Sequence, residues 1–110
     1  PNLSDADRTQ FLAIVERTGS NLATILNDIL DLAKIESGKL EVCPVPTSLC
    51  AILTDVQSLL VLRAESKGTT LRFVAEGPVS DDVLTDPIRL KQILLNVVGN
   101  AIKFTMDGEV

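Results

Sequence analysis

The chain has 110 residues; 45% of them are apolar, 23% are charged, and the formal net charge is −5. The apolar share excludes a disordered tail, and the negative charge argues against nucleic acid or an anionic membrane surface as a partner. No apolar run approaches the ~20 residues of a membrane span, and residues 1–5 are polar and acidic, unlike a signal peptide. The chain contains no histidine, which excludes a Ser-His triad, a histidine zinc site and a phosphohistidine on these residues. Its two cysteines, Cys43 and Cys50, are predicted to be reduced core residues of a cytoplasmic protein.

The region up to about Val42 is predicted to be one long helix of a helical bundle, with Ser4 as its N-cap and with Ser37 and Gly38 at its end. Two neighbouring series of mostly apolar residues repeat every seven positions, and further apolar residues widen the resulting stripe. The first series is Phe11, Thr18, Ile25 and Leu32, the second is Val15, Leu22 and Ile29, and the flanking residues are Leu12, Leu26, Leu30 and Ala33. One helix cannot bury such a stripe alone, so we expect a homodimer through the helix at residues 4–40. The alternative is that the stripe packs on the rest of this chain.

A domain boundary is predicted where Pro44 and Pro46 follow this helix. The two prolines favour an extended segment over residues 42–45, either a short edge strand or a linker. The predicted domains are therefore residues 1–42 and residues 43–110.

The second domain is predicted to alternate helices with strands. Its expected elements are a helix from the Ser48 cap to Lys67 and Gly68, a strand over residues 70–75, a turn at Gly77 and Pro78, a short strand at Val83 and Leu84, a helix from the Asp86 cap and Pro87 to about Phe104, a turn at Asp107 and Gly108, and the beginning of a strand at Glu109 and Val110. This order predicts the fold class α+β.

The third of these helices carries the clearest chemistry. Its predicted buried face consists of Leu90, Ile93, Leu94, Val97, Val98, Ala101 and Phe104, and a polar stripe on another face consists of Arg89, Gln92, Asn96, Asn100 and Lys103. The amide oxygens of Asn96 and Asn100 suit a hard cation such as Mg²⁺, and the Lys103 ammonium suits a phosphate. A solvated helix face without a ligand is the alternative interpretation.

Two blocks of the sequence resemble the sensor histidine kinases of two-component systems. Residues 25–40, Ile-Leu-Asn-Asp-Ile-Leu-Asp-Leu-Ala-Lys-Ile-Glu-Ser-Gly-Lys-Leu, are similar to the second helix of their dimerisation and histidine-phosphotransfer domain. Residues 86–95, Asp-Pro-Ile-Arg-Leu-Lys-Gln-Ile-Leu-Leu, and residues 96–105, Asn-Val-Val-Gly-Asn-Ala-Ile-Lys-Phe-Thr, are similar to the N box of their ATP-binding domain. The resemblance implies that residues 1–42 are that second helix and that residues 43–110 are the N-terminal half of the ATP-binding domain.

The same resemblance implies a role for each matching residue. Asn100 corresponds to the asparagine that ligates the Mg²⁺ held by the ATP phosphates, and Asn96 to an asparagine that faces the phosphates. Lys103 corresponds to a phosphate-contacting residue and Phe104 to an aromatic residue that packs at the nucleotide pocket. The implied fold is a long bundle-type helix followed by an incomplete two-layer α/β sandwich of the histidine kinase, Hsp90 and gyrase ATPase type. The implied parent transfers the γ-phosphoryl of ATP to a histidine and then to an aspartate of a response regulator receiver domain.

This sequence departs from the family pattern by lacking the H-box histidine and both glycine-rich nucleotide boxes. The resemblance therefore implies a fragment without a catalytic residue of its own, inactive and poor at binding ATP and Mg²⁺. Two alternatives stay open. An ATPase of the gyrase or Hsp90 superfamily carries a glutamate at the position of Asn96 to activate water, which an asparagine cannot do. A non-catalytic helical dimerisation module would use only the stripe of the first helix. A cytoplasmic location is expected for this segment, whether or not its parent is anchored in a membrane.

Overall fold

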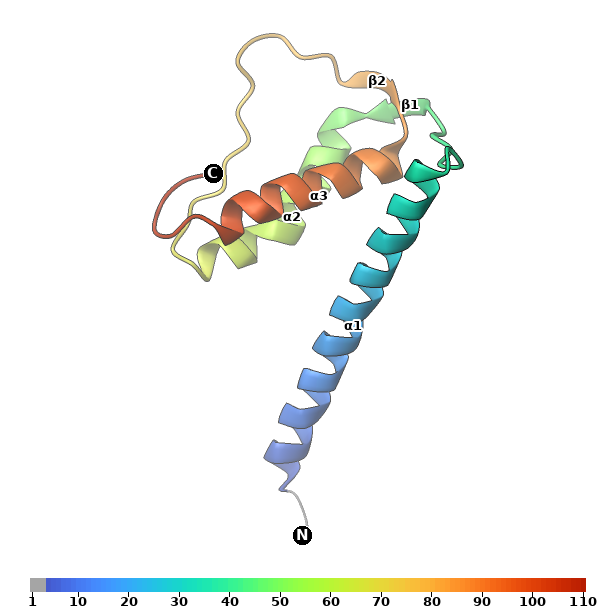
Figure 1. Cartoon of the computed structure of the whole chain (residues 1–110). Coiled ribbons are helices and arrows are strands. Elements are labelled where there is room, and N and C mark those ends of the chain that lie inside the picture. Colours follow the sequence, from blue (N-terminus) through green and yellow to red (C-terminus); the bar gives the residue numbers. More distant parts are fainter. Residues whose placement is uncertain (1–3) are drawn as a thin grey trace. The chain divides into compact units, whose positions relative to one another are not determined.

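The computed structural model describes residues 4–110, so the first three residues of the predicted domain 1–42 lie outside the described part. The elements follow in the order α1 (Asp5–Glu36), β1 (Val45–Ser48), α2 (Leu49–Glu65), β2 (Asp82–Thr85) and α3 (Pro87–Lys103), as Figure 1 shows. The chain forms two compact units, of which one ends at Glu41 and the other begins at Val42. These elements confirm the predicted class α+β. Within residues 4–110, no helix combines the length and the apolar character that a bilayer crossing requires.

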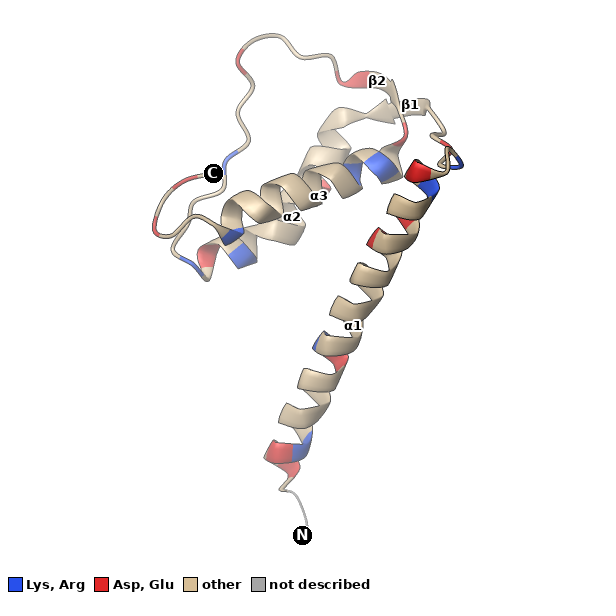
Figure 2. Cartoon of the chain, viewed as in Figure 1, with Lys and Arg blue, Asp and Glu red and all other residues tan. Residues whose placement is uncertain are grey.

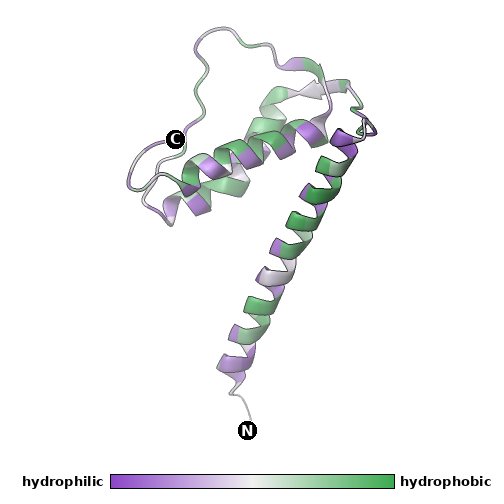
Figure 3. Ribbon diagram, viewed as in Figure 1, coloured by the Kyte–Doolittle hydropathy of each residue, from purple (hydrophilic) through white to green (hydrophobic). Residues whose placement is uncertain are grey.

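Helix α1 begins and ends where local chemistry predicts. The Ser4 hydroxyl accepts a hydrogen bond from the Asp7 amide at 3.1 Å, and the acidic residues of the first turn face the positive end of the helix dipole. At the other end Gly38 adopts a φ of 71°, a left-handed conformation that stops a helix. No residue of α1 is buried. Its apolar residues, coloured green along the ribbon in Figure 3, are exposed; Ile29, for example, is 57% exposed.

Strands β1 and β2 form a two-stranded antiparallel sheet in the second unit. Val45 lies opposite Thr85, and Ser48 lies opposite Asp82. The extended segment predicted at residues 42–45 becomes a strand only from Val45 onward, because the pairing depends on β2, which is only four residues long. The short strand predicted at Val83 and Leu84 is confirmed and extends by one residue at each end.

The core of the second unit lies between α2 and α3. Helix α2 contributes buried residues at every fourth position, and Ile102 of α3 and Leu71 complete the cluster. The buried residues of α2 are Ile52, Val56, Leu60 and Ala64. Val56 and Ile102 are both 0% exposed, so their apolar side chains are completely removed from water. A salt bridge of 3.9 Å between Lys91 Nζ and Asp55 Oδ2 also joins the two helices.

The predicted buried face of α3 is partly wrong. Leu90, Leu94 and Val98 pack partly buried against the core, as expected. Val97 and Phe104, however, are 62% and 79% exposed, and Ile93 is exposed too. The buried residues of α3 are instead Gly99 and Ile102. The error arises because α3 carries apolar residues on more than one side, and α2 covers only one of them.

The strand predicted over residues 70–75 is also wrong. Only Thr70 forms a bridge, a parallel one with Glu109. The Arg72 amide donates to the Val110 carbonyl at 2.9 Å, and no residue beyond Arg72 in this stretch is paired in the described part of the chain. A strand needs a neighbour as well as a suitable composition, and residues 108–110 supply a neighbour only this far.

Candidate functional site

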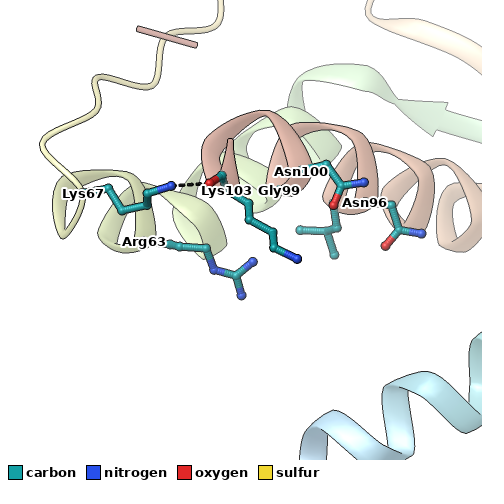
Figure 4. A pocket seen from close by; sticks show the side chains of 7 residues that line it. Arg63, Lys67, Asn96, Gly99, Asn100 and Lys103 are labelled. Carbon is teal, nitrogen blue, oxygen red and sulfur yellow. Dashed lines mark hydrogen bonds between the residues drawn. The ribbon is translucent and has the colours of Figure 1, made fainter. Parts of the chain in front are cut away.

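A pocket of about 390 Å³ opens between α2 and α3 in the second unit. Its volume lies in the range of small-molecule sites. The lining residues come from the end of α2, the turn that follows it and the C-terminal half of α3: Arg63, Lys67, Leu95, Asn96, Gly99, Asn100 and Lys103. Figure 4 shows the side chains of Arg63, Asn96, Asn100 and Lys103 extending to the same side of the two helices.

Three of the four predicted site residues meet at this pocket. Asn96, Asn100 and Lys103 lie at intervals of four and three residues, which place them on one face of α3. The side-chain amides of both asparagines are exposed and have no hydrogen-bond partner within residues 4–110. Their oxygens are therefore available to a ligand.

Phe104, the fourth predicted residue, does not line the pocket. It is the C-cap of α3, and the residue is 79% exposed. The Lys103 ammonium lies 5.5 Å from the centroid of this ring, within the range of a weak cation–π contact. Phe104 is thus linked to the pocket through Lys103.

The end of α2 and the turn that follows it contribute two cations, Arg63 and Lys67, that the sequence does not reveal as site residues. The sequence pattern indicates only a helix end at Lys67 and assigns no role to Arg63. Lys67 lies in the turn beyond Glu65, the last residue of α2, so helical spacing does not relate the two residues, and no local signal in the sequence could have identified them. Lys67 Nζ donates to the carbonyl oxygen of Ile102 at 2.8 Å and to that of Lys103, so it caps the C-terminus of α3.

The pocket is positive within an acidic chain. Arg63, Lys67 and Lys103 line it and no carboxylate does, although the whole chain has a net charge of −5. Figure 2 shows basic residues at the ends of α2 and α3 that form the pocket. Within residues 4–110, no three Asp, Glu, Cys or His side chains gather as a metal site. The donor set of amide oxygens and cations instead fits Mg²⁺ bound together with phosphate oxygens and water.

Asp86 fixes the beginning of the helix that carries the two asparagines. Its Oδ2 accepts from the Cys43 amide at 3.0 Å, and its Oδ1 accepts from the Ile88 and Arg89 amides, each at 3.1 Å. These hydrogen bonds hold the pKa of the Asp86 carboxyl below its usual value, and the one from the Cys43 amide has the largest effect. Pro87 at the first helical position needs no such acceptor.

Asp81 fixes the beginning of α2 in a similar way. Its carboxylate accepts from the Cys50 amide at 2.8 Å and from the Ser48 hydroxyl at 3.0 Å. The hydrogen bonds from Cys50 and then Ser48 lower the pKa of Asp81, and the same carboxylate raises the pKa of the Cys50 thiol. Cys50 and Cys43 are both exposed free cysteines, so their predicted burial in a core is wrong.

The chain is similar to histidine kinases over nearly its whole length. It is 43% identical over 99 residues to the signal transduction histidine-protein kinase BarA of Escherichia coli K12, which covers 90% of this chain. The crystal structure of full-length ShkA in complex with AMPPNP is 32% identical, covers 100% of this chain and has a TM-score of 0.79. The Acinetobacter baumannii histidine kinase AdeS shares the fold with a TM-score of 0.75 at 19% identity and covers 99% of this chain.

These matches concern segments of larger proteins. The matched region is 11% of BarA, and the chain spans 23% of the ShkA structure and 52% of the AdeS structure. No protein-family model matches the chain.

Proposed function

Because this chain is related in sequence to a segment of histidine kinases, we propose that it belongs to a sensor kinase of a two-component system. The intact kinase transfers the γ-phosphoryl of ATP to a histidine and then to an aspartate of a response regulator receiver domain. Residues 1–42 form the second helix of its dimerisation and histidine-phosphotransfer domain, and residues 43–110 the N-terminal half of its ATP-binding domain. The segment works in the cytoplasm.

One observation carries this proposal: Asn96, Asn100 and Lys103 line one pocket that contains no carboxylate. MgATP, when bound there, supplies the transferable phosphoryl group and a cation that neutralises its charge. Asn100 ligates Mg²⁺ through its amide oxygen, Asn96 faces the phosphates, and Lys103 contacts a phosphate. Phe104 packs against the nucleotide beside Lys103.

The residues of the pocket favour phosphoryl transfer over hydrolysis. A water-activating ATPase needs a general base at the nucleotide, and the amide of Asn96 cannot accept a proton as a carboxylate does. No lining residue supplies a carboxylate instead. The gyrase and Hsp90 type of ATPase is therefore the weaker alternative.

The exposed stripe of α1 supports the dimerisation part of the proposal. No residue of α1 is buried, although its apolar residues repeat every seven positions. A helix of this kind gains most of its stability by packing against other helices. In the intact kinase α1 packs in a homodimer. A dimerisation module without catalytic function would share this feature, but it leaves the paired asparagines of α3 unexplained.

The decisive test is Asn100→Ala in the intact kinase that contains this segment. Loss of the ligand oxygen is expected to reduce autophosphorylation by at least about 10-fold, the loss typical of a disturbed metal site. Asn100→Asp keeps an oxygen ligand but adds a negative charge facing the phosphates, and it is expected to reduce the rate as well. The measurements are phosphohistidine formation from labelled ATP and the melting temperature of each variant.

Asn27→Ala is the matched control, because it removes an exposed amide of α1 far along the sequence from the pocket. It is expected to keep normal autophosphorylation. Normal activity of Asn100→Ala would contradict its role as a metal ligand. The isolated 110-residue chain, which has no histidine, is expected to incorporate no acid-labile phosphate, and such labelling would contradict the assignment as a fragment.

A further inference from the structure

We propose that Arg63 of α2 is an anion-binding residue of the pocket, which supplies a guanidinium to the polyphosphate of the ligand from the helix opposite the two asparagines. The proposal rests on the proposed function in one respect, namely that the ligand carries phosphates. It adds a residue outside the motif of α3 and makes the site depend on two helices. The contacts of the three cations of the pocket support it.

Lys67 is already engaged by the protein. Its ammonium donates to the carbonyl oxygens of Ile102 and Lys103, the last carbonyls of α3. The C-terminus of a helix carries a partial negative charge of roughly half an electron, which would repel an anion beside it. Because the pocket lies along the last two turns of α3, Lys67 neutralises the end of the helix that would otherwise oppose phosphate binding.

Lys103 and Arg63 are the remaining cations. Within the described residues 4–110, the Lys103 side chain makes only the 5.5 Å contact with the Phe104 ring, which is weak and leaves its hydrogen-bond donors free. The guanidinium of Arg63 forms no salt bridge or hydrogen bond within residues 4–110. Two cations therefore face the pocket from different helices, and no carboxylate among the residues that line the pocket pairs with either of them.

Arg63 lies close to Gly99 of α3. A Cβ atom built on Gly99 would lie 3.6 Å from Arg63 Nη1, so the guanidinium lies directly above the bare backbone of α3. Gly99 is a buried residue of α3. In the sequence it lies between Asn96 and Asn100, on the helical turn that presents both amides. Figure 4 shows the guanidinium on the same side of the helices as the Lys103 ammonium and the two amides. A planar guanidinium with several donors suits phosphate oxygens better than a single ammonium does.

The shared chemistry of the expected ligands is a magnesium-bound polyphosphate, either that of a nucleotide or inorganic triphosphate. The test is a titration of the isotope-labelled 110-residue chain by NMR, with MgATP, magnesium tripolyphosphate and adenosine as separate probes at millimolar concentrations. Both polyphosphates are expected to shift the backbone amide signals of the pocket residues, and adenosine is not. An equal affinity for the two polyphosphates assigns binding to the phosphates, and a tighter binding of MgATP assigns an additional contact to the nucleoside.

The discriminating variants are Arg63→Gln and Arg63→Lys. Arg63→Gln is expected to weaken the binding of both polyphosphates by about fivefold at low salt, as loss of one exposed charge contact does. High salt is expected to reduce this difference, because it screens exposed charges. Arg63→Lys keeps the charge and is expected to recover most of the affinity. Arg72→Gln is the matched control, because Arg72 pairs with Glu109 and does not line the pocket.

Three results would contradict one or the other proposal. If Arg63→Gln binds as tightly as the parent while Asn100→Ala binds more weakly, the role of Arg63 is wrong and the proposed function stands. If Arg63→Gln weakens binding while Asn100→Ala does not, Arg63 is an anion-binding residue and the metal-ligand role of Asn100 is wrong. If no probe shifts any pocket residue, the proposal for Arg63 is overturned.

Discussion

Helix α1 and the unit formed by residues 42–110 differ in where their apolar side chains lie. The second unit buries Val56 and Ile102 completely, and its other buried hydrophobic residues belong to the same cluster. Helix α1 has 32 residues, none of which is buried. The difference shows that the second unit contains the contacts that stabilise it, whereas α1 has an apolar stripe whose partners are not among its own residues. The two parts should therefore respond differently to the same kind of substitution.

The largest expected effect is that of Ile102→Ala in the second unit. Removing most of a completely buried side chain should lower the free energy of unfolding by about 2–5 kcal/mol, because it leaves a cavity between α2 and α3. Ile93→Ala is the matched control on the same helix, since Ile93 is exposed; it should change the stability by less than about 1 kcal/mol. The measurement is urea unfolding followed by circular dichroism. Equal effects of the two variants would contradict the assignment of the core.

The second expected effect concerns association through α1. Ile29→Asp places a charge in the middle of the apolar stripe and should weaken self-association by about 2 kcal/mol or more, because a buried charge without a partner is costly. Asn27→Asp adds the same charge outside the repeating series and is the control. Sedimentation equilibrium measures both. If the chain is a monomer at all concentrations, or if Ile29→Asp associates like the parent, the predicted homodimer is wrong.

The smallest expected effect is the electrostatic contribution of Asp86 to stability at low pH. It concerns the second unit and not α1. The hydrogen bonds to Asp86 lower its pKa in the folded state, so they stabilise the fold fully above the ordinary aspartate pKa of about 3.9. This stabilisation is lost as the pH falls through the lower folded-state pKa.

Asp86→Asn keeps a good N-cap but removes the charge. Its stability should therefore fall less steeply than that of the parent between roughly pH 5 and pH 2. Asp82→Asn removes a charge from an exposed side chain and is the control. Acid unfolding curves of the three proteins, followed by circular dichroism, make the comparison. Identical curves for Asp86→Asn and the parent would show that this carboxylate does not contribute to acid stability.

The features that the sequence predicted well depend on local chemistry. Ser4, Ser48 and Asp86 each cap the helix that follows, and each cap hydrogen bond joins residues two or three positions apart. The polar stripe of α3 likewise follows from helical spacing alone, so the meeting of Asn96, Asn100 and Lys103 at one pocket could be foreseen.

The features that it predicted badly depend on distant partners. The strand expected at residues 70–75 pairs only where residues 108–110 reach it. Val97 is exposed because α2 covers another side of α3. Arg63 lies 33 positions before Asn96 in the sequence, and nothing in its local pattern shows that it lines the same pocket. Its place becomes visible only once α2 packs against α3.

The hydrogen bond from the Cys43 amide to Asp86 also has a mechanical consequence. Residues 37–42 connect α1 covalently to Cys43, so tension that travels along the backbone from α1 enters the second unit there. The next contact along the chain is the pairing of Val45 with Thr85, the residue directly before Asp86. Both contacts transmit the load to the N-terminus of α3. A displacement of the connecting segment therefore pulls on the helix that carries Asn96 and Asn100 before it loads the apolar contact between α2 and α3.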